Sequence, residues 1–208
     1  MAISNYSELK LAVANWLDRD DLTTRIPEFI ALAEARMNRD LRIRLMEGKY
    51  TASTVASQKN YNLPAGYRRM RNFQVNKTPV VSLQYISPEI FDRLWGGSTE
   101  ATPKFYTIIA NEVQLGPIPD SIMTIEMLFY KKVDALSDSN TTEDMLTDNP
   151  DIYLYGALME AEPFIMNPEG AMVWKGKYDE AVFNLQEQDN KDRHSGSALR
   201  VMNTGGYY

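Results

Sequence analysis

The acidic side chains offer this sequence its widest choice of chemistry. Glu160 and Glu162 lie on a segment predicted to be a buried helix, and two carboxylates in unlike environments across a cleft can hydrolyse a glycosidic bond. Residues two apart on a helix point in different directions. We therefore expect one of these carboxylates to face a neighbouring element and the other to face solvent, and we keep paired-carboxylate hydrolysis as an alternative.

Three further acids, Asp18, Asp20 and Asp21, lie close together, as they do in a calcium-binding loop. An EF-hand loop needs Gly at its sixth position and Glu at its twelfth. Counted from Asp18, those positions hold Thr23 and Phe29. The segment is therefore predicted to be a turn between two helices.

Other kinds of reactive site lack their residues. The chain has no Cys, which excludes disulfides, thiolate nucleophiles and Cys-ligated zinc. Its single histidine, His194, cannot form a site that needs two imidazoles, and nothing is expected to hold it in a fixed geometry beside Ser195. The glycines fit neither GxGxxG nor the phosphate-binding loop. We therefore predict no catalytic residue, no metal ion and no cofactor.

Arg36, Arg39, Arg42 and Arg44 form the one basic cluster. They could contact a phosphate backbone as a DNA-binding module, although the net charge of −6 opposes general attraction to nucleic acid. Alternatively, Arg36, Asp40 and Arg44 are spaced i, i+4 and i+8, so they could form a ladder of ion pairs within one helix. They could also reach a second copy of the chain. All three interpretations stay open.

The composition is that of a globular protein. Of the 208 residues, 44% are hydrophobic and 24% are charged, which suits one domain or two small ones that share a core. The early acid Glu8 and the lack of a long apolar run near it lead us to expect no secretory signal and synthesis in the cytoplasm. No stretch of 18 apolar residues occurs, so no membrane contact is expected.

The spacing of the apolar residues divides the chain into three zones. It is helical in the two outer thirds and strand-like in the middle. We therefore predict an α+β fold. It consists of a helical bundle from residues 1–47 and 133–192, a β-rich insertion at residues 48–132, and an extended C-terminal tail at residues 193–208.

Two helices are expected in the first zone. A cap at Ser4 or Ser7 begins the first helix. The second begins near Pro27, a residue suited to a first helical turn, and its apolar stripe continues to Leu41.

Two more helices are expected in the last zone. Residues 133–151 hold six acids and no base, which predicts a solvated connection. The third helix follows and is apolar almost all round, so it should be centrally buried until Pro163 bends or ends it. The fourth helix is expected to begin at Pro168 and to run to about Asp192.

In the middle zone, short segments rich in Thr, Val, Tyr and Ile are divided by Pro, Gly and Asn, which is the pattern of strands and turns. The expected strands are residues 49–57, 69–75, 80–86, 104–110, 112–115 and 122–132. Two of them should form a hairpin in which Asn111 tolerates a left-handed backbone. A short helix is expected to end at Trp95, before Gly96.

The C-terminal segment carries apolar side chains that a solvated linker does not need. Exposed apolar groups of this kind usually await a partner, whereas Gly-rich ends can also have no role. The side chains in question are Leu199, Val201, Met202, Tyr207 and Tyr208, accompanied by Arg193 and Arg200.

Six segments, taken in order over about residues 6–192, resemble the head-to-tail adaptor proteins of tailed bacteriophages. They are WLDRDDL, RIPEFIALAEARMNRDLR, YNLPAGY, PKFYTIIANEVQLGPIPD, NPDIYLYGALMEAEPFI and WKGKYDEAVFNL. The fold that the resemblance implies is a helical bundle with a β-rich insertion, which agrees with the three zones.

The resemblance implies a structural virion protein at the head-tail junction, without enzymatic activity. Such adaptors form a ring, commonly of about twelve subunits, beneath the portal. They extend the DNA channel and dock tail or nozzle proteins. A channel that passes DNA without retaining it should present acidic or neutral groups, which suits the net charge of −6.

The resemblance also suggests where the partners bind. Terminal extensions of such adaptors often grip the portal, so the expected portal contacts are Leu199, Arg200, Val201, Met202, Tyr207 and Tyr208. A ring needs an interface between two different faces of the subunit. Arg36, Asp40 and Arg44 are candidates for one face and the tail for the other. A cell-wall hydrolase and a DNA-binding module stay as alternatives.

Overall fold

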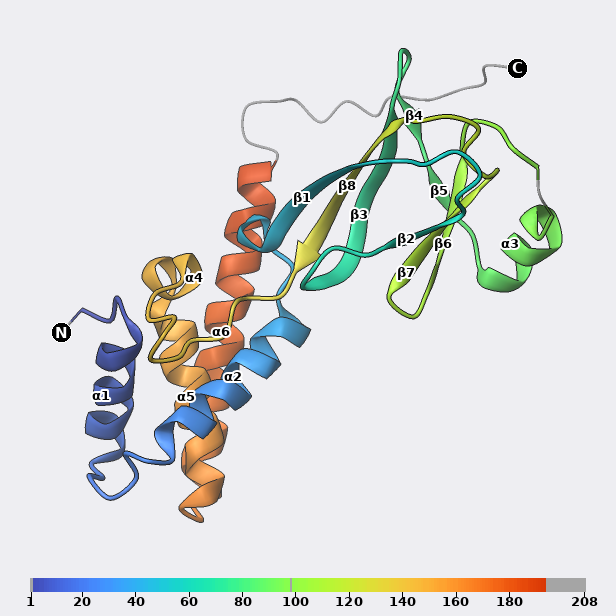
Figure 1. Cartoon of the computed structure of the whole chain (residues 1–208). Coiled ribbons are helices and arrows are strands. Elements are labelled where there is room, and N and C mark those ends of the chain that lie inside the picture. Colours follow the sequence, from blue (N-terminus) through green and yellow to red (C-terminus); the bar gives the residue numbers. More distant parts are fainter. Residues whose placement is uncertain (1, 98, 194–208) are drawn as a thin grey trace. The chain divides into compact units, whose positions relative to one another are not determined.

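The computed structural model describes residues 2–97 and 99–193, which divide into two compact units (Figure 1). The helical unit combines the segment up to Leu45 with the segment from Val133 onward, and the β unit comprises Met46–Lys132. The predicted α+β class is confirmed, because helices from the two ends of the chain pack together and two four-stranded sheets lie between them in the sequence. Of the predicted tail at 193–208, Arg193 is the last residue of a helix and the rest lies outside the described residues.

The helical unit is built around one central helix. Its helices are α1 (Tyr6–Leu17), α2 (Ile26–Asp40), α4 (Asp144–Asp148), α5 (Pro150–Phe164) and α6 (Pro168–Arg193). Helix α5 contacts each of the other four. Its apolar run is therefore buried on nearly all sides, as the sequence predicted.

The helix ends follow local chemistry. The predicted caps of α1 are wrong: Asn5 is the N-cap, and its Oδ1 accepts a hydrogen bond from the backbone N–H of Glu8 at 2.9 Å. Helix α2 has Pro27 in its first turn, as predicted. It ends at Asp40 because Leu41 adopts an extended backbone with ψ at 141°.

The acid-rich connection before α5 is more ordered than predicted. It contains the short helix α4, whose Met145 and Leu146 are buried. These two apolar side chains attach the segment to the unit, because burying them removes apolar surface from water. The prediction of a solvated connection is therefore wrong for this part of it.

The β unit is a pair of four-stranded sheets. The strands are β1 (Glu47–Ser53), β2 (Asn60–Asn62), β3 (Tyr67–Asn76), β4 (Val81–Ser82), β5 (Gln84–Tyr85), β6 (Phe105–Ile109), β7 (Glu112–Gly116) and β8 (Thr124–Lys131). Their order is β1-β8-β3-β4 in one sheet and β2-β7-β6-β5 in the other, and only β5 and β6 pair in parallel. Both sheets contribute to one apolar core. Its buried residues are Leu63, Phe73, Val75, Leu83, Tyr106, Val113, Leu115, Ile125, Met127 and Phe129.

Two details of the β unit differ from the sequence prediction. Strand β2 was not predicted, and it forms by pairing with β7. In the hairpin of β6 and β7, Ala110 and not Asn111 adopts the left-handed backbone, with φ at 54°.

The predicted helix before Gly96 is confirmed as α3 (Pro88–Trp95). It packs closely on β7, because a Cβ at Gly116 would lie 2.8 Å from the Phe91 ring.

Within the described part of the chain, none of the helices has the length and apolar character that a membrane span requires.

Candidate functional site

Arg36, Asp40 and Arg44 do not form the ladder that their spacing suggested. The Arg36 guanidinium donates to Oε1 of Glu160 on α5 at 2.9 and 2.7 Å. Nε of Arg44 donates to Oδ1 of Asp189 on α6 at 2.9 Å. Because α2 ends at Asp40, Arg44 lies beyond the helix and cannot stack on it. Both arginines find their carboxylates on other helices of the same unit.

Asp189 is the centre of a charged network at the end of α6. Its buried carboxylate accepts hydrogen bonds from the backbone N–H and side chain of Arg44 and from Nε of Arg193 at 2.7 Å. Burial alone would raise the pKa of Asp189, but the hydrogen bonds from the two arginines outweigh it and lower the pKa. The buried charge is thus compensated within the chain.

A cleft of about 470 Å³ opens beside this network. Asp189 and Asp192 both line it, and both accept hydrogen bonds from the Arg44 guanidinium. The same guanidinium engages both carboxylates, whereas the acid and the base of such a hydrolysis need unlike environments. These two acids therefore lack the contrast that paired-carboxylate hydrolysis requires.

Asp40 joins α2 to α6. Its carboxylate accepts from the hydroxyl of Tyr178 at 3.3 Å, and its backbone carbonyl accepts from the amide of Gln186 at 3.0 Å. Burial raises the pKa of Tyr178, and the Asp40 charge adds to that shift. Further down the helices, a Cβ at Gly156 of α5 would lie within 3.5 Å of both Ala33 and Tyr178. Ala33 thus lies near Tyr178, and Asp40, further along α2, contacts Gln186, further along α6. The two helices therefore run parallel.

The four arginines do not form an open basic patch. Arg42 donates to the carbonyls of Asn38 and Leu41 and so caps the end of α2. Arg36 and Arg44 are ion-paired. Arg39 is exposed and has no ion-pair partner among the described residues.

Glu160 and Glu162 point to different elements. Glu160 pairs with Arg36 of α2. Glu162 is buried and accepts from Nδ2 of Asn167 at 2.9 Å and Nε1 of Trp174 at 3.0 Å. The prediction that one of them faces solvent is wrong, because both serve as ties between helices. Their carboxylates do not converge on a common point.

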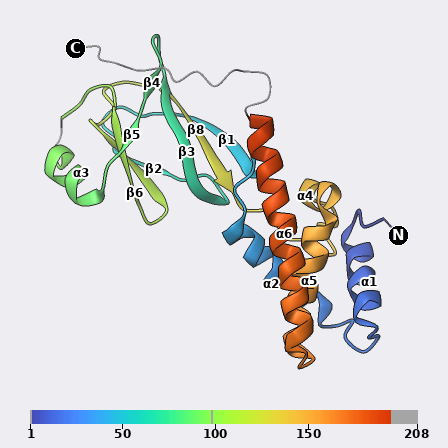
Figure 2. The same cartoon turned by 180° about the vertical axis from the view of Figure 1, so that it is seen from behind.

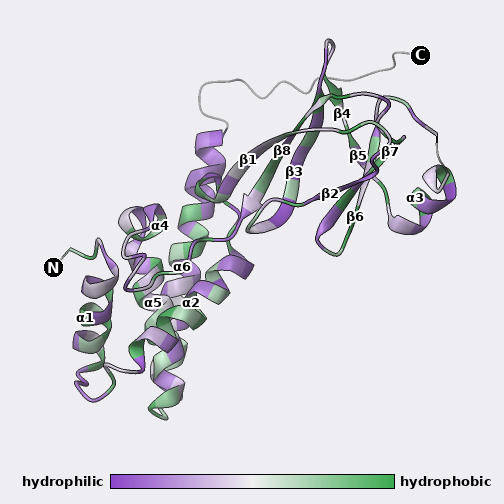
Figure 3. Cartoon of the chain, viewed as in Figure 1, coloured by the Kyte–Doolittle hydropathy of each residue, from purple (hydrophilic) through white to green (hydrophobic). Residues whose placement is uncertain are grey.

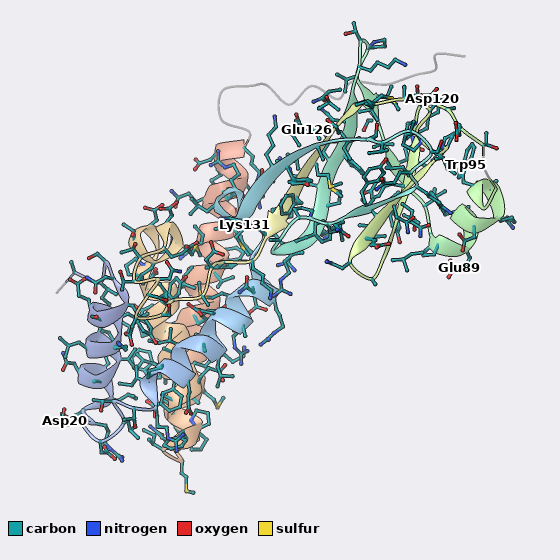
Figure 4. The ribbon with its side chains drawn as sticks, in the orientation of Figure 1. Asp20, Glu89, Trp95, Asp120, Glu126 and Lys131 are labelled. Atoms are coloured by element: carbon teal, nitrogen blue, oxygen red, sulfur yellow. The ribbon has the colours of Figure 1, made fainter. Side chains whose placement is uncertain are left out.

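The turn between α1 and α2 has the ordinary structure of a helix connection. Asp18 ends α1 with a left-handed backbone, φ 51°. The Arg19 guanidinium donates to both carboxylate oxygens of Asp21 at 2.7 Å. Asp20 lies at the far end of this turn (Figure 4). No group of three potential metal ligands occurs among the residues that the structure describes.

Two buried polar residues of α2 were missed. Glu34 accepts from the backbone N–H of Leu136 at 2.8 Å, and Oδ1 of Asn38 accepts from that of Val133 at 2.9 Å. They fasten the segment that follows the β unit to α2. Burial raises the pKa of Glu34 to about 7. Ile30, Glu34 and Asn38 follow one another at four-residue spacing along the buried stripe of α2. This spacing is the signal that could have revealed the two polar residues.

The helical unit also exposes large apolar side chains that its core does not use. Five of the nine within the described residues fall between positions 164 and 183. The nine are Leu11, Trp16, Leu32, Leu45, Phe164, Met166, Met172, Val173 and Phe183. A concentration of exposed apolar groups marks a surface for protein contacts.

Charged groups that are paired within the chain, together with exposed apolar side chains, are typical of a protein that makes contacts with other proteins. The model of the SU10 adaptor protein family matches residues 4–202, so the chain belongs to this family of phage head-tail adaptors. Membership implies a structural role and binding to other virion components. Comparison with curated proteins gave no match.

Proposed function

We propose that the chain assembles into a ring of about twelve copies beneath the portal, extends the DNA channel and docks tail or nozzle proteins. The observation that carries this proposal is the family match over residues 4–202. The exposed apolar side chains between positions 164 and 183 support it, because a ring must bury such surface between copies. The net charge of −6 suits a channel that passes DNA without binding it specifically.

The role is structural and needs no catalytic residue, metal or cofactor. What supports this is the use of the best candidate acids: Glu160 and Glu162 tie helices together, and Asp189 compensates two arginines. The geometry therefore favours the adaptor over a cell-wall hydrolase. It also favours the adaptor over a DNA-binding module, since Arg36, Arg42 and Arg44 are engaged.

The portal contact is assigned to the C-terminal segment. Its residues Leu199, Arg200, Val201, Met202, Tyr207 and Tyr208 lie outside the described residues, so the assignment rests on their apolar and aromatic character. On one further point the sequence prediction stays a prediction. Arg36, Asp40 and Arg44 can meet a neighbouring copy only through the parts of their side chains that the intrachain pairs leave exposed.

Electron microscopy of the protein mixed with purified portal tests this function. We expect a second ring stacked on the portal ring. Deletion of residues 195–208 should abolish portal binding and leave the circular dichroism spectrum unchanged. Portal binding by the shortened chain would overturn the tail assignment, and a protein that stays monomeric with and without portal would overturn the ring.

A further inference from the structure

Helix α6 carries exposed apolar side chains that none of the described residues covers. On this helix of 26 residues, the side chains of Met172, Val173 and Phe183 are 76%, 57% and 63% exposed. At 100° per residue they fall within about a third of the helix circumference, together with Glu180. Figure 3 shows that the last turns of α6 are hydrophilic instead. We call this stripe the outer face of α6.

Helix α2 has a matching exposed stripe. Ala31, Leu32, Ala35 and Arg39 are all exposed and share one side of the helix. Leu32 is 52% exposed, close to the value for Val173 of α6. We call this stripe the outer face of α2. Its small side chains leave room for another helix to approach.

The two faces carry complementary charge. Glu180 is joined on the outer face of α6 by Glu169 and Glu187 with no base between them, and Lys191 follows at the end of the helix. The outer face of α2 also carries Glu28, whose charge is paired with Arg25 at 2.9 Å, whereas Arg39 has no ion-pair partner among the described residues. Packing α6 on a second α6 would bring these acids together, whereas packing it on α2 places Arg39 among them.

The spacing along the two faces also agrees. Val173 and Glu180 are seven residues apart, as are Leu32 and Arg39. Within the chain α2 and α6 run parallel and lie on opposite sides of the unit, with α2 in front in Figure 1 and α6 in front in Figure 2. Neighbours in a ring of many copies differ by a small rotation. An α6 and the α2 of the next copy therefore keep nearly the same direction.

We propose that the outer face of α6 in one copy packs against the outer face of α2 in the next, with Val173 against Leu32 and Glu180 beside Arg39. This rests on the proposed ring and names the two surfaces that close it. The interface is heterologous, because two different faces meet. Such an interface continues from copy to copy, while a like-with-like contact would stop at a dimer.

The absence of Cys from the sequence makes a direct test simple. We expect the double variant Leu32→Cys with Val173→Cys, treated with a short bismaleimide, to give a ladder of crosslinked species up to the ring size. Each single variant should give no ladder, since each interface then has one thiol. The matched control is Leu11→Cys with Val173→Cys, because Leu11 is 48% exposed on another helix.

The outcomes separate this inference from the proposed function. Rings in the microscope without a ladder would overturn the α6–α2 interface and leave the ring in place. A chain that neither crosslinks nor forms rings would overturn both. As a second measurement, Glu180→Arg should raise the concentration needed for ring formation about fivefold, and adding Arg39→Glu should restore it. If the exchanged pair does not restore ring formation, Glu180 and Arg39 do not meet across the interface.

Discussion

The two units of the chain are held together in different ways. The β unit has a core of apolar side chains from both sheets. The helical unit, in addition to its apolar residues, buries Glu34, Asn38, Glu162 and Asp189 among its helices, and each of them is hydrogen-bonded. Buried polar groups demand specific partners, whereas apolar packing tolerates many combinations. The packing of the helical unit therefore depends on specific pairs of groups as well as on apolar contact.

Their surfaces differ as well. The exposed large apolar side chains of the β unit are spread over strands, loops and α3, from Tyr50 to Ile122. Of the nine that the structure describes in the helical unit, five fall between positions 164 and 183. The contrast teaches that the unit with the hydrogen-bonded buried polar groups is also the one whose exposed apolar side chains lie close together in the sequence.

The largest expected effect is in the apolar core. Phe73→Ala should lower the free energy of unfolding of the β unit by about 4 kcal/mol, because it removes a fully buried ring and leaves a cavity. Hydrogen exchange measures this unit by unit: amides of β3 and β8 should exchange about a thousandfold faster. Those of α5 should change less than tenfold. Equal loss of protection in α5 would show that the two units unfold as one.

A smaller effect is expected from the polar core. The pKa of Glu34 is raised to about 7, so its neutral form contributes stability that is complete below about pH 4.5 and lost as the pH rises through 7. Between pH 5 and pH 8 this loss should amount to about 2 kcal/mol. Denaturant unfolding of Glu34→Gln should lack this loss, because Gln keeps the acceptor for Leu136 without a charge.

The control for this titration is Glu28→Gln, an exposed acid on the same helix. It should leave the pH dependence of unfolding as it is in the parent chain. If Glu34→Gln keeps the parent's pH dependence, the raised pKa of Glu34 is contradicted.

The smallest effect on stability is expected at the outer face of α6. Phe183→Ser should change the free energy of unfolding by less than about 0.5 kcal/mol, because the side chain is exposed. It serves as the exposed counterpart of Phe73→Ala in thermal unfolding of the monomeric protein. A loss of several kcal/mol would mean that α6 packs more deeply than the structure shows.

Sequence periodicity predicted the fold class and the long helices because these depend on local patterns. Helix α6 was expected at 168–192 and is found at Pro168–Arg193. Strand β2 was missed because its three residues are held by β7, far along the sequence. Helix α4 was missed because the acids in and around it indicated a solvated segment, whereas its Met145 and Leu146 are buried.

The ion pairs could not be predicted from the sequence. Arg36 and Glu160 are 124 positions apart, and Arg44 and Asp189 are 145 apart. Their meeting depends on how α2, α5 and α6 cross, whereas spacing along one helix reveals only neighbours on that helix. The exposed apolar side chains of α6 could not be identified either, because spacing along a helix does not show which of its faces the other helices cover.

Gly156 has a consequence for the size of the proposed ring. A Cβ there would lie 3.0 Å from that of Ala33 and 3.5 Å from the Tyr178 ring, so any side chain would spread α2 and α6 apart. In the proposed ring, the separation of those helices sets the distance between the two outer faces of each copy. The missing side chain at this position of α5 thus limits the width of each copy, and with it the circumference at which the proposed ring closes.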